Sequence, residues 1–115
     1  MGLIRHSDGR PDQPVPGVSR VTIVERASGA GALTTRIVTI APGTRMKPHW
    51  HYVEEAMMVL EGEGRAMLGD EEMDIKAGET LLGPANVKHG FHNTGSVAMK
   101  LAVAFPAVDV ETFTD

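Results

Sequence analysis

The chain has 115 residues, of which 42% are hydrophobic and 23% charged, and its formal net charge is −4 at pH 7. This length suits one domain with a single core, and an acidic balance without a basic stripe argues against nucleic acid or an anionic membrane as a partner. Cysteine is absent, which excludes disulfides and thiolate metal ligands. Because no apolar run has transmembrane length and no basic-then-apolar leader pattern is seen, we expect a cytoplasmic protein.

Prolines and glycines are frequent at the start of the chain, among them Gly9, Pro11, Pro14 and Gly17. Both residue types interrupt regular secondary structure. We therefore predict an irregular N-terminal arm over residues 1–18, which could cross the protein's own surface or a partner. A single β-barrel domain is expected over residues 19–115.

Short runs rich in β-branched and apolar residues follow, separated by turns that contain glycine or proline. Many short strands at regular spacing are typical of a β-sandwich or barrel, so we predict an all-β fold. No stretch has the pattern of a long amphipathic helix. The expected strands are Ser19–Arg26, Leu33–Ala41, Ala56–Glu61, Arg65–Leu68, Met73–Lys76, Glu79–Leu82, His89–Asn93 and Val97–Ala104.

Three histidines and one glutamate are candidates for the ligands of one metal site: His49, His51, Glu55 and His89. Imidazole and carboxylate suit divalent Mn, Fe, Co, Ni, Cu or Zn. Alternate side chains of a strand share a face, so His49 and His51 point the same way, and Glu55 joins them if the backbone stays extended. By the same reasoning Glu54 points outward and is the weaker candidate.

Strand alternation also predicts the surroundings of this site. Residues that share the inward parity are expected to form its apolar walls: Met57, Val59, Phe91, Met99 and Leu101. Trp50 and Tyr52, the only tryptophan and the only tyrosine, alternate with the histidines and should face outward. Because both residue types are enriched in interfaces, we expect them to contribute to a homodimer interface. The alternative is that they pack under the N-terminal arm.

Other polar residues are weaker candidates for catalysis or substrate binding at the site. His92 lies one residue off the face of His89, so it is a weak catalytic candidate, at best a proton carrier. Arg36, Arg45 and Lys47 could orient an anionic substrate, although most surface charges have no specific role. Asn93 is expected to brace a turn.

Two motifs in the chain resemble those of small single-domain cupins. The first is Gly43, five residues, His49, one residue, His51, three residues, Glu55, six residues and Gly62. In the second, Gly78, Pro84, His89 and Asn93 match, while Asn86 replaces the usual glycine. Asparagine tolerates a positive φ better than other non-glycine residues, so this departure is mild. The resemblance covers residues 19–106.

The resemblance implies a double-stranded β-helix (jelly-roll) barrel with one divalent metal held by His49, His51, Glu55 and His89. The fold alone does not imply a reaction. We expect an enzyme of the dioxygenase, isomerase, lyase or decarboxylase type that acts on a small oxygenated substrate, such as a keto acid, a sugar acid, an enediol or a phenolic compound. The alternative is a non-catalytic cupin module that binds or senses a small molecule.

Overall fold

The computed structural model describes residues 2–114, and within them the chain forms β-strands and two short 3₁₀ turns. The turns are η1 (His6–Asp8) and η2 (Arg26–Ser28). The strands, in chain order, are β1 (Arg10–Val15), β2 (Val18–Val24), β3 (Thr34–Ile40), β4 (Glu55–Glu61), β5 (Glu63–Leu68), β6 (Glu71–Lys76), β7 (Thr80–Gly83), β8 (His89–His92) and β9 (Met99–Phe105).

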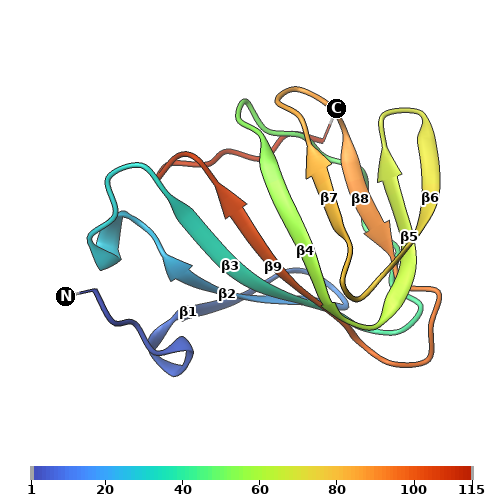
Figure 1. Ribbon diagram of the computed structural model, residues 1–115, viewed down its shortest axis with the longest axis horizontal. Coiled ribbons are helices and arrows are strands. Elements are labelled where there is room, and N and C mark those ends of the chain that lie inside the picture. Colours follow the sequence, from blue (N-terminus) through green and yellow to red (C-terminus); the bar gives the residue numbers. More distant parts are fainter. Residues whose placement is uncertain (1, 115) are drawn as a thin grey trace.

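The strands form two antiparallel sheets. One has six strands in the order β1-β2-β3-β9-β4-β7, and the other has three in the order β6-β5-β8. Figure 1 shows the smaller sheet beside β4 and β7, with the segment that follows β9 running along the upper rim of the barrel toward β8. This is the all-β jelly-roll barrel that the sequence predicted. Each predicted strand is present, and its ends are shifted by two residues or fewer.

The prediction of an irregular arm is wrong for residues 10–15, because β1 pairs with β2 in an antiparallel hairpin. Pro11 and Pro14 are compatible with this strand because β1 is the edge of its sheet, where a missing N–H need not break a ladder. Pro16 and Gly17 form the turn, in which Gly17 has a φ of 82°. Proline followed by a positive-φ glycine is the pattern of a type II turn.

The inward residues form one core between the sheets. In the ladder between β4 and β9, Met57 lies opposite Val103 and Val59 opposite Leu101. The five residues predicted to face inward are all buried, with no more than 3% of their surface exposed: Met57, Val59, Phe91, Met99 and Leu101. The predicted strand register is therefore confirmed.

The turn before β8 contains Asn86, whose φ is 68°. It is the only non-glycine residue of positive φ among residues 2–114. The expected tolerance of asparagine at this motif position is thus confirmed.

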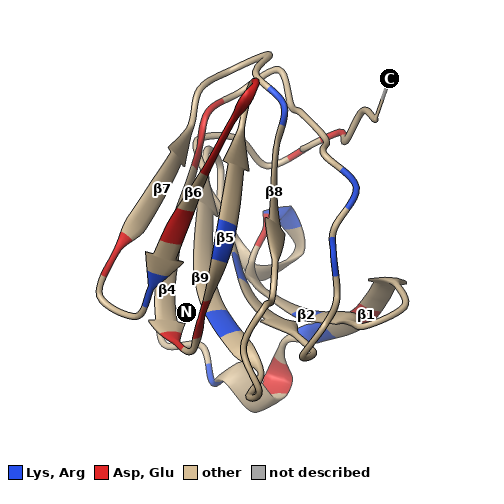
Figure 2. Ribbon diagram, turned by 90° about the vertical axis from the view of Figure 1, so that its right-hand side faces the viewer, with Lys and Arg blue, Asp and Glu red and all other residues tan. Residues whose placement is uncertain are grey.

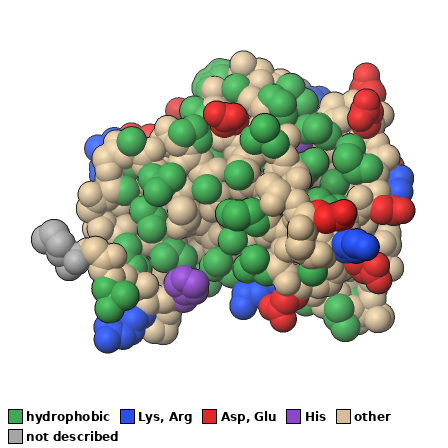
Figure 3. All heavy atoms as spheres, viewed as in Figure 1, with side chains coloured by type: hydrophobic (Ala, Val, Ile, Leu, Met, Phe, Trp, Pro, Cys, Tyr) green, Lys and Arg blue, Asp and Glu red, His purple; other side chains and the backbone are tan. Residues whose placement is uncertain are grey.

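The outer surface differs between the two sheets. Arg65 of β5 pairs with Asp74 of β6 at 2.8 Å, and charged stretches mark both strands in Figure 2. On the neighbouring strands β4 and β7, by contrast, Met58, Leu60 and Leu82 are exposed. In Figure 3, hydrophobic side chains gather over the middle of the visible face, and most charged side chains lie toward its edges.

No helix within residues 2–114 has the length and apolar character needed to cross a bilayer.

Candidate metal centre

The four predicted ligands come together where the two sheets meet. Glu55 is the first residue of β4 in the large sheet, and His89 is the first residue of β8 in the small sheet. His49 and His51 lie in the segment that leads into β4. The backbones of His49 and His89 exchange two hydrogen bonds, of 3.0 and 2.8 Å, which fix the histidine segment against the start of β8.

One potential ligand atom from each residue lies within 4.8 Å of the others. Oε1 of Glu55 is 2.8 Å from Nε2 of His89 and 3.3 Å from Nε2 of His51. His51, Glu55 and His89 are buried, with 3%, 6% and 1% of their surface exposed, and His49 is half-buried. A buried carboxylate among imidazoles needs a compensating positive charge.

The orientation of the three rings shows where that charge would sit. Nδ1 of His51 is 2.9 Å from the carbonyl oxygen of Glu111. Nδ1 of His49 and of His89 face the carbonyl oxygens of Lys47 and Val87 at 3.2 and 3.3 Å. A carbonyl accepts a hydrogen bond, so each Nδ1 carries the proton and each Nε2 keeps its lone pair. Such backbone contacts typically orient histidine ligands of metals.

With that tautomer, two acceptors face each other inside the protein. Glu55 Oε1 and His89 Nε2 are buried and have no hydrogen-bond partner among the described residues. Two lone pairs at 2.8 Å repel unless a cation or an added proton lies between them. The donor set of three imidazoles and one carboxylate fits a divalent transition metal.

The charges of the site favour the forms that bind a metal. Burial lowers the pKa of His49, which favours the neutral form of this ring. Burial alone would raise the pKa of Glu55, but its contacts with the His51 and His89 rings, when these carry an added proton, outweigh burial, so this pKa is lowered. A neutral imidazole and an ionised carboxylate are the forms that ligate.

The backbone between His51 and Glu55 differs from the prediction. The placement of Glu55 on the histidine face assumed extended backbone there, but the chain bends at Tyr52 and Val53, and β4 begins only at Glu55. The bend does not exchange the two neighbouring glutamates. Glu54 is exposed and Glu55 is buried in the cluster, as predicted.

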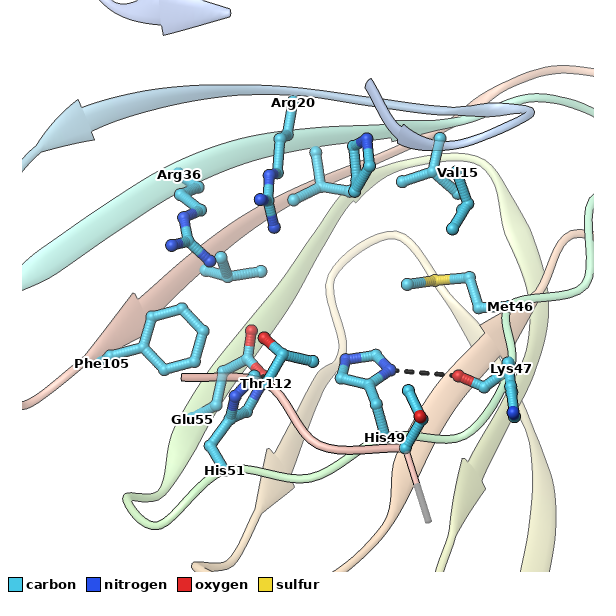
Figure 4. Close-up of a pocket in the computed structure, with 15 residues that line it drawn as sticks. Val15, Arg20, Arg36, Met46, Lys47, His49, His51, Glu55, Phe105 and Thr112 are labelled. Carbon is cyan, nitrogen blue, oxygen red and sulfur yellow. Dashed lines mark hydrogen bonds and ion pairs between the residues drawn. The ribbon is translucent and has the colours of Figure 1, made fainter. Parts of the chain in front are cut away.

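A cavity of about 220 Å³ opens beside the cluster (Figure 4). Its apolar lining includes Val18, Val38, Met46, Val103 and Phe105, and its polar lining includes Arg20, Arg36, Lys47 and Thr112. The five predicted wall residues do not line it, so that prediction is wrong. The prediction that Met99 and Leu101 of β9 face inward was right. Only the later inward residues of this strand, Val103 and Phe105, line the cavity, whereas Met99 and Leu101 belong to the core.

The structure separates the remaining candidates. His92 does not belong to the cluster, and its Nδ1 lies 3.4 Å from Nη1 of Arg45. Arg45 also contacts Glu72 at 3.5 Å and does not line the cavity, whereas Arg36 and Lys47 do. Asn93 braces the turn after β8, because its Nδ2 donates to the carbonyls of Ile40 and Val97 at 2.9 Å.

The segment that follows β9 also contributes to the site, although none of its residues was among the predicted site residues. Beyond the contact of Glu111 with His51, Phe113 forms a backbone bridge with Trp50, and Thr112 and Thr114 line the cavity. The Phe113 ring stacks on Trp50 with centroids 4.6 Å apart. Phe113 is the only aromatic residue of this segment, and this sequence signal did not identify Trp50 as its partner.

Comparison with known proteins supports the fold. The family model described as a cupin domain matches residues 36–105. Protein SchB of Streptomyces halstedii is 30% identical over 100 residues, which are 86% of this chain and 72% of SchB. Auxin-binding protein 1 of Arabidopsis thaliana is 28% identical over 108 residues, 85% of this chain and 54% of that protein. The chain thus spans about half of the second relative.

Two solved structures share the architecture. The polyketide cyclase RemF from Streptomyces resistomycificus superposes with a TM-score of 0.84 at 19% identity, over 99% of this chain and 84% of RemF. Oxalate decarboxylase from Bacillus subtilis, in a study of its Mn(II) centres, has a TM-score of 0.84 at 17% identity and covers 96% of this chain and 31% of that chain. At these identities the likeness concerns the fold alone.

Proposed function

Because this chain belongs to the family of cupin-domain proteins, we propose that it is a metal-dependent enzyme acting on a small oxygenated substrate. His49, His51, Glu55 and His89 would hold one divalent ion. Three imidazoles and one carboxylate suit Mn, Fe, Co, Ni, Cu or Zn. The observation that carries the proposal is the buried contact between Glu55 Oε1 and His89 Nε2, two acceptors without a hydrogen-bond donor.

A divalent ion in this place would supply Lewis-acid chemistry at a carbonyl or hydroxyl oxygen of the substrate. The protein's own residues supply binding and orientation. Val38, Val103 and Phe105 make the space next to the cluster apolar. Glu55 is the only carboxylate among the described residues that line the cavity, so no separate general base stands beside it. Substrate positioning and charge are therefore the main contributions of these side chains.

The size of the cavity limits the substrate class. About 220 Å³ suits a keto acid, a sugar acid, an enediol or a single-ring phenolic compound, and it lies below the range of most drug-sized pockets. Two structural neighbours, the polyketide cyclase RemF and oxalate decarboxylase, are named for reactions on oxygen-rich molecules. These names support a small oxygenated compound as the substrate.

A non-catalytic role is the second candidate, since auxin-binding protein 1 is a relative named for binding a small molecule. In that case the cavity would retain its ligand unchanged. Incubating the metal-loaded protein with 2-oxo acids and phenolic acids separates the two roles, because an enzyme converts at least one of them and a binding module converts none.

Elemental analysis of protein purified without a metal-affinity tag tests the metal site directly. We expect one divalent ion per chain in the wild type. Glu55→Gln should leave a substoichiometric content after dialysis, because it replaces the only anionic ligand with a neutral one. The matched control is Glu54→Gln, one residue away and exposed, which should keep the full content. Equal metal content in both variants would contradict the assigned ligand set.

We further propose a homodimer. Tyr52 is 65% exposed, and Met58, Leu60 and Leu82 are exposed on neighbouring strands. Apolar and aromatic side chains of this kind are typical of the centres of protein interfaces.

A further inference from the structure

Two arginines enter the cavity, and they differ in their partners. Arg20 of β2 is held by Asp12 through two hydrogen bonds of 2.8 and 2.9 Å. For Arg36 of β3, no carboxylate within residues 2–114 lies at ion-pair distance, and its Nε is buried without a hydrogen-bond partner. Among the described residues, Arg36 thus has no direct ion-pair partner at the wall of the cavity, and Glu55 and Asp12 act on its charge only from a greater distance.

The rest of the site holds Arg36 in place. Its guanidinium lies over the Phe105 ring, 5.2 Å from the centroid, a cation–π contact that orients the planar group. In Figure 4, Arg20 and Arg36 extend from their strands toward the space above Glu55 and His51. Burial, together with the charge of Arg20, lowers the pKa of Arg36. An anion bound in the cavity would supply the missing ion-pair partner of Arg36 and would counteract the lowering of its pKa.

The cavity is a positive region in an acidic protein. The chain carries a net charge of −4, yet Arg20, Arg36 and Lys47 line the cavity and Glu55 is the only carboxylate among its described lining residues. Asp12 compensates Arg20, and Glu55 faces the histidines. Of the described residues that line the cavity, Arg36 is therefore a cation that is free to form a direct ion pair with a ligand.

We propose that Arg36 recognises a carboxylate of the substrate. The planar guanidinium pairs with a carboxylate through parallel N–H···O hydrogen bonds, a geometry that lysine cannot reproduce. The apolar side chains of Val18, Val38 and Val103 then contact the body of the substrate. This inference rests on the proposed function in one respect, which is that a second oxygen of the same molecule faces the histidine cluster. It narrows the substrate to carboxylic acids that carry an additional oxo or hydroxyl group.

The test compares an acid with its neutral ester. Binding of phenylpyruvate and of methyl phenylpyruvate is measured by calorimetry on the protein as purified, and the metal content of each sample is recorded. We expect the wild type to bind the acid at least about tenfold more tightly than the ester, because a charge-assisted pair is lost in the ester. Arg36→Gln should remove this preference and leave the affinity for the ester unchanged.

Two further variants keep the result interpretable. Arg36→Lys retains the charge but not the planar fork, and should keep only part of the preference for the acid. Arg10→Gln removes the same charge from an exposed ion pair with Glu25 outside the cavity, and should keep the full preference. If Arg36→Gln does not fold, Arg36→Lys replaces it in the test, and a reduced preference of this variant for the acid over the ester is the expected result.

Failure of this inference differs from failure of the proposed function. If metal is present and Arg36→Gln still prefers the acid, the metal alone recognises the carboxylate, and the role of Arg36 is wrong. Equal binding of acid and ester by the wild type, or no binding of either, also overturns that role. If no sample contains metal but the preference depends on Arg36, the anion site stands and the metal-dependent enzyme does not.

Discussion

At the scale of single residues, the turn before His89 depends on Asn86, whose φ of 68° lies in the left-handed region. Most side chains are strained in this conformation, whereas glycine is not and asparagine is only mildly so. The turn also positions the histidine segment, because the amide of Asn86 donates to the carbonyl of His51 at 2.8 Å. Asn86 therefore links the local conformation of a turn to the geometry of the metal centre.

Substitutions of Asn86 should separate conformation from side-chain chemistry. Asn86→Gly should change the free energy of unfolding by less than about 1 kcal/mol, since glycine adopts positive φ freely. Asn86→Val should destabilise the protein by roughly 1–2 kcal/mol, because its branched Cβ clashes in the left-handed region. Urea denaturation monitored by tryptophan fluorescence measures both. Equal stability of the two variants would show that the positive φ carries no cost.

The clustering of the four candidate ligands could be predicted from the sequence, because local spacing groups His49, His51 and Glu55, and the second motif of the resemblance adds His89. His49, His51, Glu55 and His89 converge even though the backbone bends before Glu55. The position of the cavity could not be predicted in the same way. Parity assigns a side chain to a face of a strand, but it does not say how far along the strand the cavity extends, and so Met99 was expected at the wall instead of Phe105.

At the scale of elements, the segment after β9 (residues 106–114) forms a strap across the candidate metal centre. Thr34 Oγ1 donates to the carbonyl of Ala107 at 2.6 Å, and the backbone of Phe113 pairs with that of Trp50. Between these two anchors, the carbonyl of Glu111 fixes the tautomer of His51. The strap therefore contributes to the site through orientation and not through ligation.

Phe113→Ala tests the strap. Loss of the stacking on Trp50 should loosen the segment and, through Glu111, lower the affinity for the metal by about 10-fold, at the lower end of the 10- to 100-fold range for residues that orient ligands. Metal titration against a competing chelator gives the affinity. The matched control is Val97→Ala, an apolar truncation at a residue that is 61% exposed and lies before β9, outside the strap. If Phe113→Ala binds the metal with unchanged affinity, the segment covers the aromatic rings but does not orient His51.

The hairpin of β1 and β2 carries an acid-sensitive contact. The hydrogen bond from Arg20 outweighs burial and lowers the pKa of Asp12 below its ordinary value of 3.8. A lowered pKa in the folded state means that the stabilisation is fully present above pH 3.8 and is lost as the pH falls through the folded value. Asp12→Asn should cost about 0.2–1 kcal/mol at neutral pH.

The measurement is the melting temperature as a function of pH. Wild type and Asp12→Asn should differ at neutral pH and converge at low pH, where Asp12 is protonated in both states of the wild type. A difference that stays constant through the acidic range would mean that the charge of Asp12 is not the cause.

The elements that could not be predicted from the sequence are those that depend on pairing between distant segments. Periodicity and turn residues predicted the strands from β2 to β9, since these signals are local. β1 was missed because Pro11 and Pro14 argue against a strand in general, and only its place at the sheet edge makes them acceptable. The bridge between Trp50 and Phe113 joins residues from opposite halves of the chain, which no local pattern reveals.

At the scale of the whole molecule, the proposed homodimer can be tested by light scattering. We expect the mass of a dimer at micromolar concentration, with a buried area above about 1,000 Å². Two surfaces compete for the interface: the region of Tyr52, which contacts Phe113 at a ring distance of 4.7 Å, and the outer face of β4 and β7. Tyr52→Ser and Met58→Ser/Leu82→Ser identify the one that matters, because only the variant in the interface should dissociate. A monomeric wild type would contradict the dimer.

The origin of the candidate ligands in two different sheets has a consequence for the rate of unfolding. Glu55 begins a strand of one sheet and His89 a strand of the other, so a bound ion joins the two layers of the barrel. The layers cannot separate without breaking coordination bonds, and the ion should slow global unfolding as well as raise the equilibrium stability. Backbone amides of β8, which lies at the edge of the three-stranded sheet, would then exchange their hydrogens with solvent at a rate set by the release of the metal.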